Sequence, residues 1–594
     1  MALLKGDFMR NHVVFIISVM ILSAFLVAGC TQPQTLVQSP QPVTAVPTPV
    51  QTKSISVQTT VVQPSAVVPV VTSRTAIPGT TGTVKATTTV ATAPVPTTFD
   101  YSIYSSDSSE PTPTPPDPTV LKTDAGYISG LQQNGLRVYL GIPFAAPPTG
   151  DLRWRSPAPV TPWDGVKEAK AFSANPPQPP SGSPVPDSMS EDCLYLNVWT
   201  PAQSADEKLP VMVFFYGGAF TQAAPFDTIA LYNGTTLAQK GVIVVTTNYR
   251  LGALGFMAHP QLDNESVNNV SGNYGILDQQ AALQWVQRNI GAFGGDPSRV
   301  TIFGQSAGGE SVLIHLVSPG SKGLYSQAII ESGPFWANGP TIDNVHSKAD
   351  AEQFGQQYVQ SLGYSGPDAI REMREVSAGE IVNTSPWPAS SWNRTHTLKF
   401  EPTIDGWLLP DSVDALFALH RENPVPFMIG TNANDGTTLS AGANMTVPEY
   451  IAFLRNYFGT DADTVFAKYP ANSTGEVQLR LAQIMTRYDF ADAAKFAAGS
   501  MGDQERNTYL YRYSYALPNQ PDGAFHGSET FLLFGMTNEV KANPVVAATL
   551  VDLWTQFAKT GDPNGGANVT WPHYTRAEGL YLDINNVSTV MSGY

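Results

Sequence analysis

The sequence Gly-Gln-Ser-Ala-Gly at residues 304–308 constrains the fold of this chain more than any other segment. It directly follows the apolar-rich stretch 299–303, and a serine between two glycines can occupy a turn too sharp for bulkier neighbours. Such a turn joins a strand to a helix, lifts the Ser306 hydroxyl above a sheet and directs the helix N-terminus toward developing negative charge. Five-residue matches of this kind also occur by chance, so the assignment depends on the surrounding elements.

Apolar, β-rich runs recur along the chain with helical stretches between them. Residues 278–290 carry apolar side chains at helical spacing, whereas the strand-like runs are short and apolar on both faces. This alternation predicts an α/β fold in which a large, mostly parallel sheet is covered by helices on both faces. Ligands of such sheets bind beyond the carboxyl ends of the strands, and Ser306 lies at such an end. The strand-like runs are 211–215, 242–245, 299–303, 328–330 and 427–429.

The N-terminus has the pattern of a targeting segment. Two basic residues precede the apolar run 13–28, which is followed by Gly-Cys and so resembles the lipobox of prokaryotic lipoproteins. The resemblance implies a signal peptide at 1–29, cleavage before Cys30 and a lipid on its sulfur. The alternative is an uncleaved anchor, for which the apolar run is short. Both interpretations place the globular part outside the cytoplasm, so we expect a membrane-anchored lipoprotein at the cell surface.

Residues 30–118 differ in composition from the rest of the chain. They consist largely of Pro, Thr, Val, Ser and Gln with almost no charge, which predicts a disordered linker. From residue 119 to 594, aromatic, glycine and apolar runs alternate as in a globular domain. The formal net charge of −16 and a pI near 4.9 argue against nucleic acid or an anionic membrane surface as a partner.

The chain has two cysteines, Cys30 and Cys193. If Cys30 carries a lipid, Cys193 has no disulfide partner, and the domain is stabilised by its core alone.

Two longer segments resemble a known family. Residues 293–308 are similar to the serine signature of the type-B carboxylesterases, which include cholinesterases and fungal lipases. Residues 191–201 are similar to the second signature of that family, and the likeness extends from about residue 126 to 574. The resemblance implies an α/β-hydrolase fold for 119–594 and cleavage of a small-molecule ester through an acyl-enzyme. No cofactor or metal is implied, and we expect a monomer.

The order of the chain restricts the candidate catalytic partners of Ser306. In α/β-hydrolases the acid and then the histidine follow the serine, so only His526 and His573 come late enough. The Phe-His-Gly-Ser-Glu sequence at 525–529 resembles the histidine loop of the family, which favours His526 as the base. Asp435 follows a predicted strand at the position where the family usually has glutamate, and it is the expected acid. The alternative for Asp435 is an ordinary Asp-Gly surface turn.

The oxyanion hole requires backbone N–H groups near the serine. By the family pattern these come from Ala307 and from Gly218 and Ala219, where Ala219 replaces a frequent third glycine. Glu529 and Ser332 match positions that in the family form a buried network behind the histidine, either catalytic or purely structural.

Differences from the family pattern restrict the class of ester that we expect as substrate. Gln305 stands before the nucleophile, where many members carry glutamate, so a negative charge is missing beside the acyl centre. Residues 175–190 contain no aromatic side chain to hold a quaternary ammonium group. Neutral carboxylic esters are therefore expected rather than choline esters. Lipase, carbamate-hydrolase and plant-wall-esterase activities remain alternatives, as does a non-catalytic surface adhesion module. Aromatic candidates for the substrate pocket are Phe335, Trp336, Trp387 and Trp392.

Overall fold

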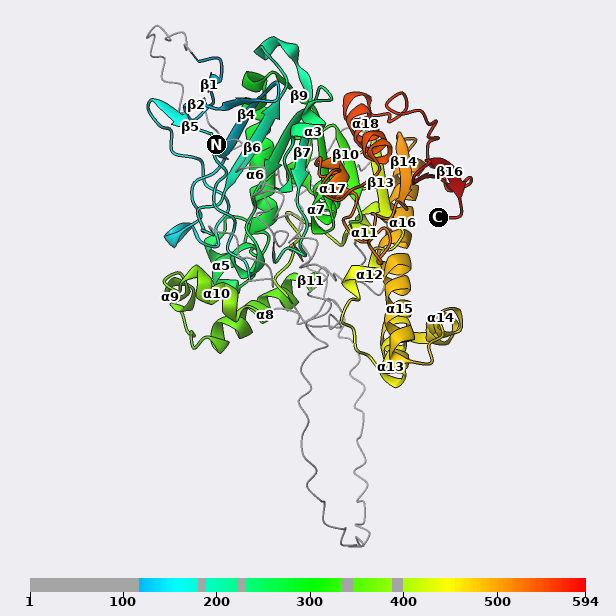
Figure 1. Ribbon diagram of the computed structural model, residues 1–594. Coiled ribbons are helices and arrows are strands. Elements are labelled where there is room, and N and C mark those ends of the chain that lie inside the picture. Colours follow the sequence, from blue (N-terminus) through cyan, green and yellow to red (C-terminus); the bar gives the residue numbers. More distant parts are fainter. Residues whose placement is uncertain (1–116, 180–188, 223–230, 334–345, 387–398) are drawn as a thin grey trace, which may run out of the picture. The chain divides into compact units, whose positions relative to one another are not determined.

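An eleven-stranded mixed sheet forms the centre of the computed structural model (Figure 1). The structure describes residues 117–179, 189–222, 231–333, 346–386 and 399–594, all within one compact unit. Across the sheet the strands are β16 (Thr589–Ser592), β15 (Leu580–Ile584), β14 (Thr508–Tyr513), β13 (Phe427–Asn432), β10 (Gln327–Glu331), β9 (Gly295–Gln305), β7 (Leu209–Phe215), β8 (Ile243–Thr247), β6 (Tyr195–Thr200), β4 (Leu136–Pro143) and β3 (Leu131–Gln133).

Seven neighbouring strands, from β15 to β8, pair in parallel. The edge strands β16 on one side and β6, β4 and β3 on the other pair antiparallel. Every residue of β8, β10 and β13 is buried, as expected for strands that are covered on both faces. The predicted α/β fold with a mostly parallel sheet is therefore confirmed. Four of the five predicted strands lie within strands of this sheet, and the fifth, 242–245, overlaps β8, which begins one residue later, at Ile243.

Helices cover both faces of the sheet (Figure 1). The predicted helix at 278–290 is α6, which begins earlier, at Tyr274, because Tyr274 and Ile276 extend its buried face. The helices of the described residues are α3 (Thr235–Ala238), α4 (Gly252–Phe256), α5 (Pro260–Glu265), α6 (Tyr274–Asn289), α7 (Ala307–Val317), α8 (Lys348–Ser361), α9 (Ala369–Met373), α10 (Ala378–Thr384), α11 (Val413–Ala418), α12 (Gly436–Leu439), α13 (Val447–Phe458), α14 (Ala462–Lys468), α15 (Thr474–Ile484), α16 (Asp492–Asp503), α17 (Thr530–Leu533) and α18 (Pro544–Thr560).

Smaller elements complete the described chain. A π-helix, η7 (Met485–Ala491), joins α15 to α16. Two small sheets consist of β1 (Val120–Lys122), β2 (Tyr127–Ser129) and β5 (Val166–Glu168), and of β11 (His346–Ser347) and β12 (Thr403–Ile404). Short 3-10 turns are η2 (Gly150–Leu152), η3 (Ala205–Glu207), η4 (Ile290–Phe293), η5 (Pro319–Ser321) and η6 (Gly459–Asp461).

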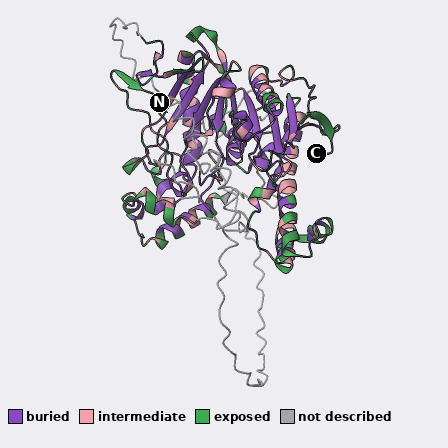
Figure 2. Cartoon of the chain, in the orientation of Figure 1, coloured by how far each residue is buried: buried purple, intermediate pink, exposed green. Residues whose placement is uncertain are grey.

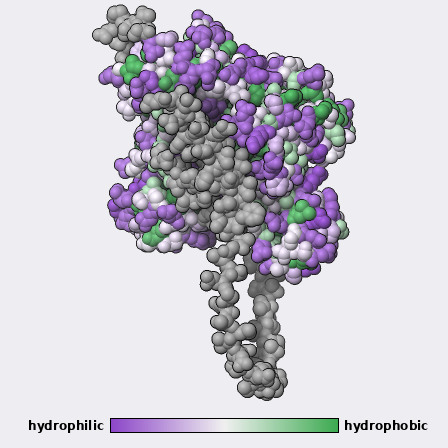
Figure 3. Space-filling model, in the orientation of Figure 1, coloured by the Kyte–Doolittle hydropathy of each residue, from purple (hydrophilic) through white to green (hydrophobic). Residues whose placement is uncertain are grey.

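Burial follows this layering. The central strands and α7 are buried, whereas β16 and much of α13 and α14 are exposed (Figure 2). On the face seen in Figure 3 the apolar side chains of the described residues are scattered among hydrophilic ones, and single exposed apolar residues are normal for a globular surface. Among the described residues, no helix combines the length and the apolar character that crossing a bilayer requires.

The sheet brings three loops together at the carboxyl ends of its strands. β9 ends at Gln305, directly before Ser306, and Asp435 follows β13. The loop after β14 carries His526 and pairs with the loop after β13, because Asn434 and Phe525 form a parallel bridge. The Asn434 N–H also donates to the Ala524 carbonyl at 3.0 Å. Residues more than two hundred positions apart thus meet at one edge of the sheet.

Candidate active site

Ser306 occupies the sharp turn between β9 and α7. Its backbone has φ 59° and ψ −128°, and its N–H donates to the Glu331 carbonyl at 2.9 Å. A Cβ atom on Gly304 would overlap the Gly308 carbonyl, and one on Gly308 would overlap the Phe215 carbonyl. Both glycines are therefore needed for the backbone to fold this tightly, and a non-glycine residue at positive φ is a strained conformation typical of functional sites. The half-buried Ser306 side chain is presented at the end of the strand.

His526 and Asp435 are hydrogen-bonded to each other, with 2.8 Å between Nδ1 and Oδ1. Asp435 is fully buried, and its second oxygen, Oδ2, accepts hydrogen bonds from the Asn432 N–H at 2.8 Å and from the Ser332 hydroxyl at 3.0 Å. Three donors thus hold the carboxyl group in one orientation. A buried carboxylate on Nδ1 fixes the imidazole ring and favours the tautomer whose Nε2 carries a lone pair.

The Nε2 atom of His526 faces Gln305 rather than Ser306. The Gln305 Nε2 atom lies 3.2 Å from it, and among the described residues the structure shows no hydrogen bond between the Ser306 hydroxyl and His526. The Phe490 ring, from η7, packs on the imidazole with 5.1 Å between ring centroids. The histidine and its carboxylate partner are therefore hydrogen-bonded to each other, and Nε2 of the histidine contacts the side chain of the residue that precedes Ser306.

The glycine loop after β7 lies against the nucleophile. A Cβ atom on Gly217 would be 2.8 Å from the Ser306 Cβ. Gly218, Ala219 and the following residue all have positive φ, with values of 117° for Gly218 and 54° for Ala219. Ala219 thus adopts the left-handed conformation that a glycine would take more easily. Ala307 is the first residue of α7, where N–H groups have no partner within the helix.

A buried polar network lies behind the histidine. The Asn432 side chain donates to Glu529, one of the two residues expected there, and the Asn432 backbone N–H donates to Asp435. Glu331, which precedes Ser332, accepts from Trp554 Nε1 at 2.6 Å. Burial and the repulsion of Glu529 raise the pKa of Glu331 to about 8, and burial, followed by the charge of Asp435, raises the pKa of Glu529 to about 7.

Three of these contacts were not foreseen from the sequence. Asn432 stands in the polar run just after a predicted strand, which is the signal that could have identified it. Glu331 and Phe490 carry no such signal, because a glutamate in a strand and a phenylalanine in a helix gain their roles only from tertiary packing.

The other late or nearby histidines are engaged elsewhere. His315 lies on α7, fully buried, within 2.8 Å of the Ser321 hydroxyl and 3.1 Å of Gln279, and burial lowers its pKa to about 3. His573 is exposed and contacts the Tyr509 hydroxyl at 3.3 Å. Neither hydrogen-bonds to Ser306 or Asp435 in the part of the chain that the structure describes.

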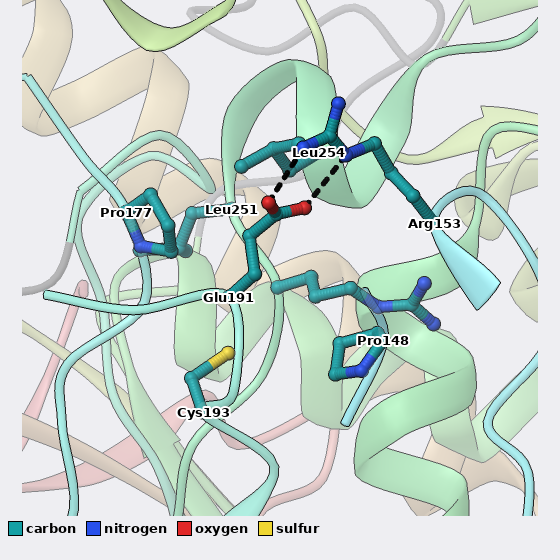
Figure 4. Close-up of a pocket in the computed structure, with 8 residues that line it drawn as sticks. Pro148, Arg153, Pro177, Glu191, Cys193, Leu251 and Leu254 are labelled. Atoms are coloured by element: carbon teal, nitrogen blue, oxygen red, sulfur yellow. Dashed lines mark hydrogen bonds and ion pairs between the residues drawn. The ribbon is translucent and has the colours of Figure 1, made fainter. Parts of the chain in front are cut away.

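Cys193 is a free, buried thiol beside a small internal cavity (Figure 4). Burial raises its pKa well above the usual range, so the thiol stays protonated. In Figure 4, Arg153 and Glu191 face each other across the lining and are joined by hydrogen bonds of 2.7 and 2.6 Å. The charged side chains of its lining are held in ion pairs, Arg153 with Glu191 and Arg250 with Asp278, and we assign it a structural role. It is lined by Pro148, Arg153, Pro177, Glu191, Cys193, Arg250, Leu251 and Leu254.

Several predicted residues lie outside the described residues. These are the N-terminal targeting segment with Cys30, nearly all of the linker at 30–118, and the aromatic candidates Phe335, Trp336, Trp387 and Trp392.

Comparison with known proteins is consistent with this geometry. Residues 117–594 match the model of the Carboxylesterase family. The chain is 36% identical over 481 residues to the fumonisin B1 esterase of Sphingopyxis macrogoltabida, a match that covers 77% of this chain and 85% of that protein. It is 34% identical over 489 residues to the para-nitrobenzyl esterase of Bacillus subtilis (78% and 94% covered), and 32% identical over 513 residues to a cholinesterase of Mus musculus (78% and 83% covered).

Proposed function

Because the chain belongs to the carboxylesterase family and is a carboxylic ester hydrolase, we propose that Ser306, His526 and Asp435 are its catalytic triad. The observation that carries the proposal is the 2.8 Å hydrogen bond between His526 Nδ1 and a fully buried Asp435, next to a serine held in a strained turn. An adhesion module would need none of these features, and esterase relatives argue against it.

In the acylation step, the Ser306 Oγ attacks the ester carbonyl carbon while its proton passes to His526 Nε2. Asp435 stabilises the imidazolium that forms. The backbone N–H groups of Gly218, Ala219 and Ala307 receive the developing oxyanion, and each such donor is worth roughly 3 kcal/mol of barrier. The tetrahedral intermediate then collapses, the C–O bond to the alcohol breaks, and the Nε2 proton leaves with the alkoxide.

In the deacylation step, water repeats this sequence on the acyl-enzyme. His526 removes a proton from the water, the hydroxide adds to the acyl carbon, and the bond to Ser306 Oγ breaks as Nε2 returns the proton to the serine. The products are the carboxylic acid and free enzyme, and no cofactor takes part.

The substrates we propose are neutral esters. Gln305 carries no charge beside the nucleophile, and residues 175–190 offer no aromatic side chain for a cation. Two of the relatives are named for action on fumonisin B1 and on para-nitrobenzyl esters, whereas a third is a cholinesterase. A choline ester compared with its neutral carbon isostere tests the assignment, and we expect the neutral ester to have the higher kcat/KM.

For the N-terminal part, we propose a signal peptide at 1–29, a lipid on Cys30 and a linker over 30–118 that presents the catalytic domain at the cell surface. The lipobox-like sequence and the uncharged Pro- and Thr-rich composition support this proposal. Cys30→Ser is expected to shift the protein from the membrane fraction or to block its processing. Unchanged fractionation and size would rule out lipidation.

The triad is tested by labelling with a fluorophosphonate. We expect one adduct, on Ser306, and Ser306→Ala should lose labelling and at least about 10⁴-fold in kcat. His526→Ala should behave alike, whereas His573→Ala and Ser298→Ala, which alter exposed residues of the same types, should retain activity. An adduct on another serine, or full ester hydrolysis by Ser306→Ala, would refute the triad.

A further inference from the structure

The contact between Gln305 and His526 is built into the site. Gln305 is 6% exposed, and its amide lies in a slot between two glycines. A Cβ atom on Gly217 would be 3.1 Å from Gln305 Oε1, and one on Gly527 would be 3.3 Å from Gln305 Nε2. Larger residues at either position would press on the amide, so the glycines leave the room that the side chain needs to reach the imidazole.

The proton positions follow from the partners of the ring. Asp435 accepts on Nδ1, which places the proton there and leaves a lone pair on His526 Nε2. The Gln305 Nε2 atom, 3.2 Å away, carries only hydrogens and can donate to that lone pair. If His526 were an imidazolium, its Nε2 would also carry a proton, and the two nitrogen atoms would both be donors with no acceptor between them. This hydrogen bond therefore exists with the neutral ring and is lost when the ring is protonated.

We propose that Gln305 is a positioning residue that binds neutral His526 at Nε2 and so extends the activity of the enzyme to lower pH. The inference rests on the triad proposed above. In the resting enzyme Gln305 donates to His526 Nε2. When an ester binds, the Ser306 hydroxyl replaces Gln305 there, because both groups donate to the same lone pair.

The groups around the imidazole explain why a neutral side chain matters at position 305. Asp435 and Glu529 lie on one side, and Glu331 is in register with Gln305 on the neighbouring strand β10. Phe490, whose ring packs on the imidazole, carries no charge. A carboxylate at 305 would accept a proton from Nε2 instead of donating one, and would thereby stabilise the inactive imidazolium.

The test is the pH dependence of kcat/KM for the full-length protein and two variants. Gln305→Met keeps the length of the side chain but removes the donor, and Gln305→Glu keeps its shape but adds a negative charge. We expect the apparent pKa of the acid limb of the profile to be higher by about half to one pH unit in Gln305→Met, which is the equivalent of one neutral hydrogen bond. In Gln305→Glu the apparent pKa of the acid limb should be higher still, by about one to three pH units relative to the wild type.

Controls separate this inference from the triad. Thermal unfolding of each variant checks that it folds, and Glu331 and Glu529 remain in all of them, so differences between profiles report on position 305. If the acid limbs have the same apparent pKa in all three proteins, or a lower one in Gln305→Met, the inference is overturned while the triad is left intact. Full activity in His526→Ala would instead overturn the triad.

Discussion

Glu331→Gln should make the free energy of unfolding less dependent on rising pH, because it removes a buried carboxyl group that stays protonated in the folded protein. Glu331 is fully buried, with one oxygen bonded to Trp554 Nε1 and, among the described residues, no hydrogen-bond partner for the other. A glutamine has nearly the same shape and can still accept the Trp554 hydrogen bond. The substitution therefore changes the titration of this site with little change in packing.

The magnitude follows from the two pKa values of Glu331. The unfolded chain releases the proton near the ordinary value of 4.5, and the folded chain releases it near 8. Between these values the folded state binds more protons, so the free energy of unfolding falls as pH rises. At about 1.4 kcal/mol for each pH unit of separation, the loss is on the order of 5 kcal/mol. Glu529, with a pKa near 7, acts in the same direction, and the two are not additive because they titrate as a pair.

The assay is denaturant unfolding of the wild type and Glu331→Gln between pH 5 and pH 9. The wild type should lose stability across this range, while the variant should have a clearly flatter profile and be the more stable of the two at the alkaline end. Glu375→Gln, which alters an exposed glutamate, should leave the slope unchanged. Parallel profiles for the wild type and Glu331→Gln would show that Glu331 is not protonated in the folded protein.

Three further substitutions test the site. Asp435→Asn should lower kcat by about 10⁴-fold in steady-state assays, because the amide no longer holds the reactive tautomer of the histidine; a loss below tenfold would contradict its role. Ser332→Ala removes one donor to Asp435 Oδ2 and should lower kcat/KM by about tenfold, with KM nearly unchanged. Gly308→Ala should greatly lower the Tm or prevent folding, because its Cβ would overlap the Phe215 carbonyl. Gly475→Ala, in open space on helix α15, is the matched control and should not lower the Tm.

The features predicted correctly from the sequence are those that local patterns specify. Strands buried on both faces appear as short apolar runs, and the turn at Ser306 requires glycines at fixed positions, so both can be read without tertiary information. The pairing of Asp435 with His526 was within reach because chain order in this fold restricts which residues can meet. The start of α6 was missed by one turn, since its buried first residues depend on packing.

The contacts around the base could not be predicted in the same way. Phe490 reaches His526 from a π-helix, and the sequence of that segment has no feature that distinguishes it from an ordinary helix. Gln305 was recognised as a missing charge, but its hydrogen bond to His526 Nε2 depends on where the loop after β14 places the ring. The contact between Gln305 and His526 joins residues more than two hundred positions apart, and only the assembled sheet determines it.

A single residue, Gln305, connects the substrate preference and the pH range that we propose. Glu331, with a pKa near 8, is mostly protonated at neutral pH, and the Asp435 carboxyl is hydrogen-bonded to His526. A glutamate at 305 would add a negative charge that attracts a cationic alcohol and, through the same charge, stabilises the imidazolium. Gln305→Glu should therefore raise the apparent pKa of the acid limb. It should also increase the ratio of kcat/KM for a choline ester to kcat/KM for its neutral isostere. A variant in which one property changes without the other would show that the preference for neutral esters arises elsewhere in the pocket.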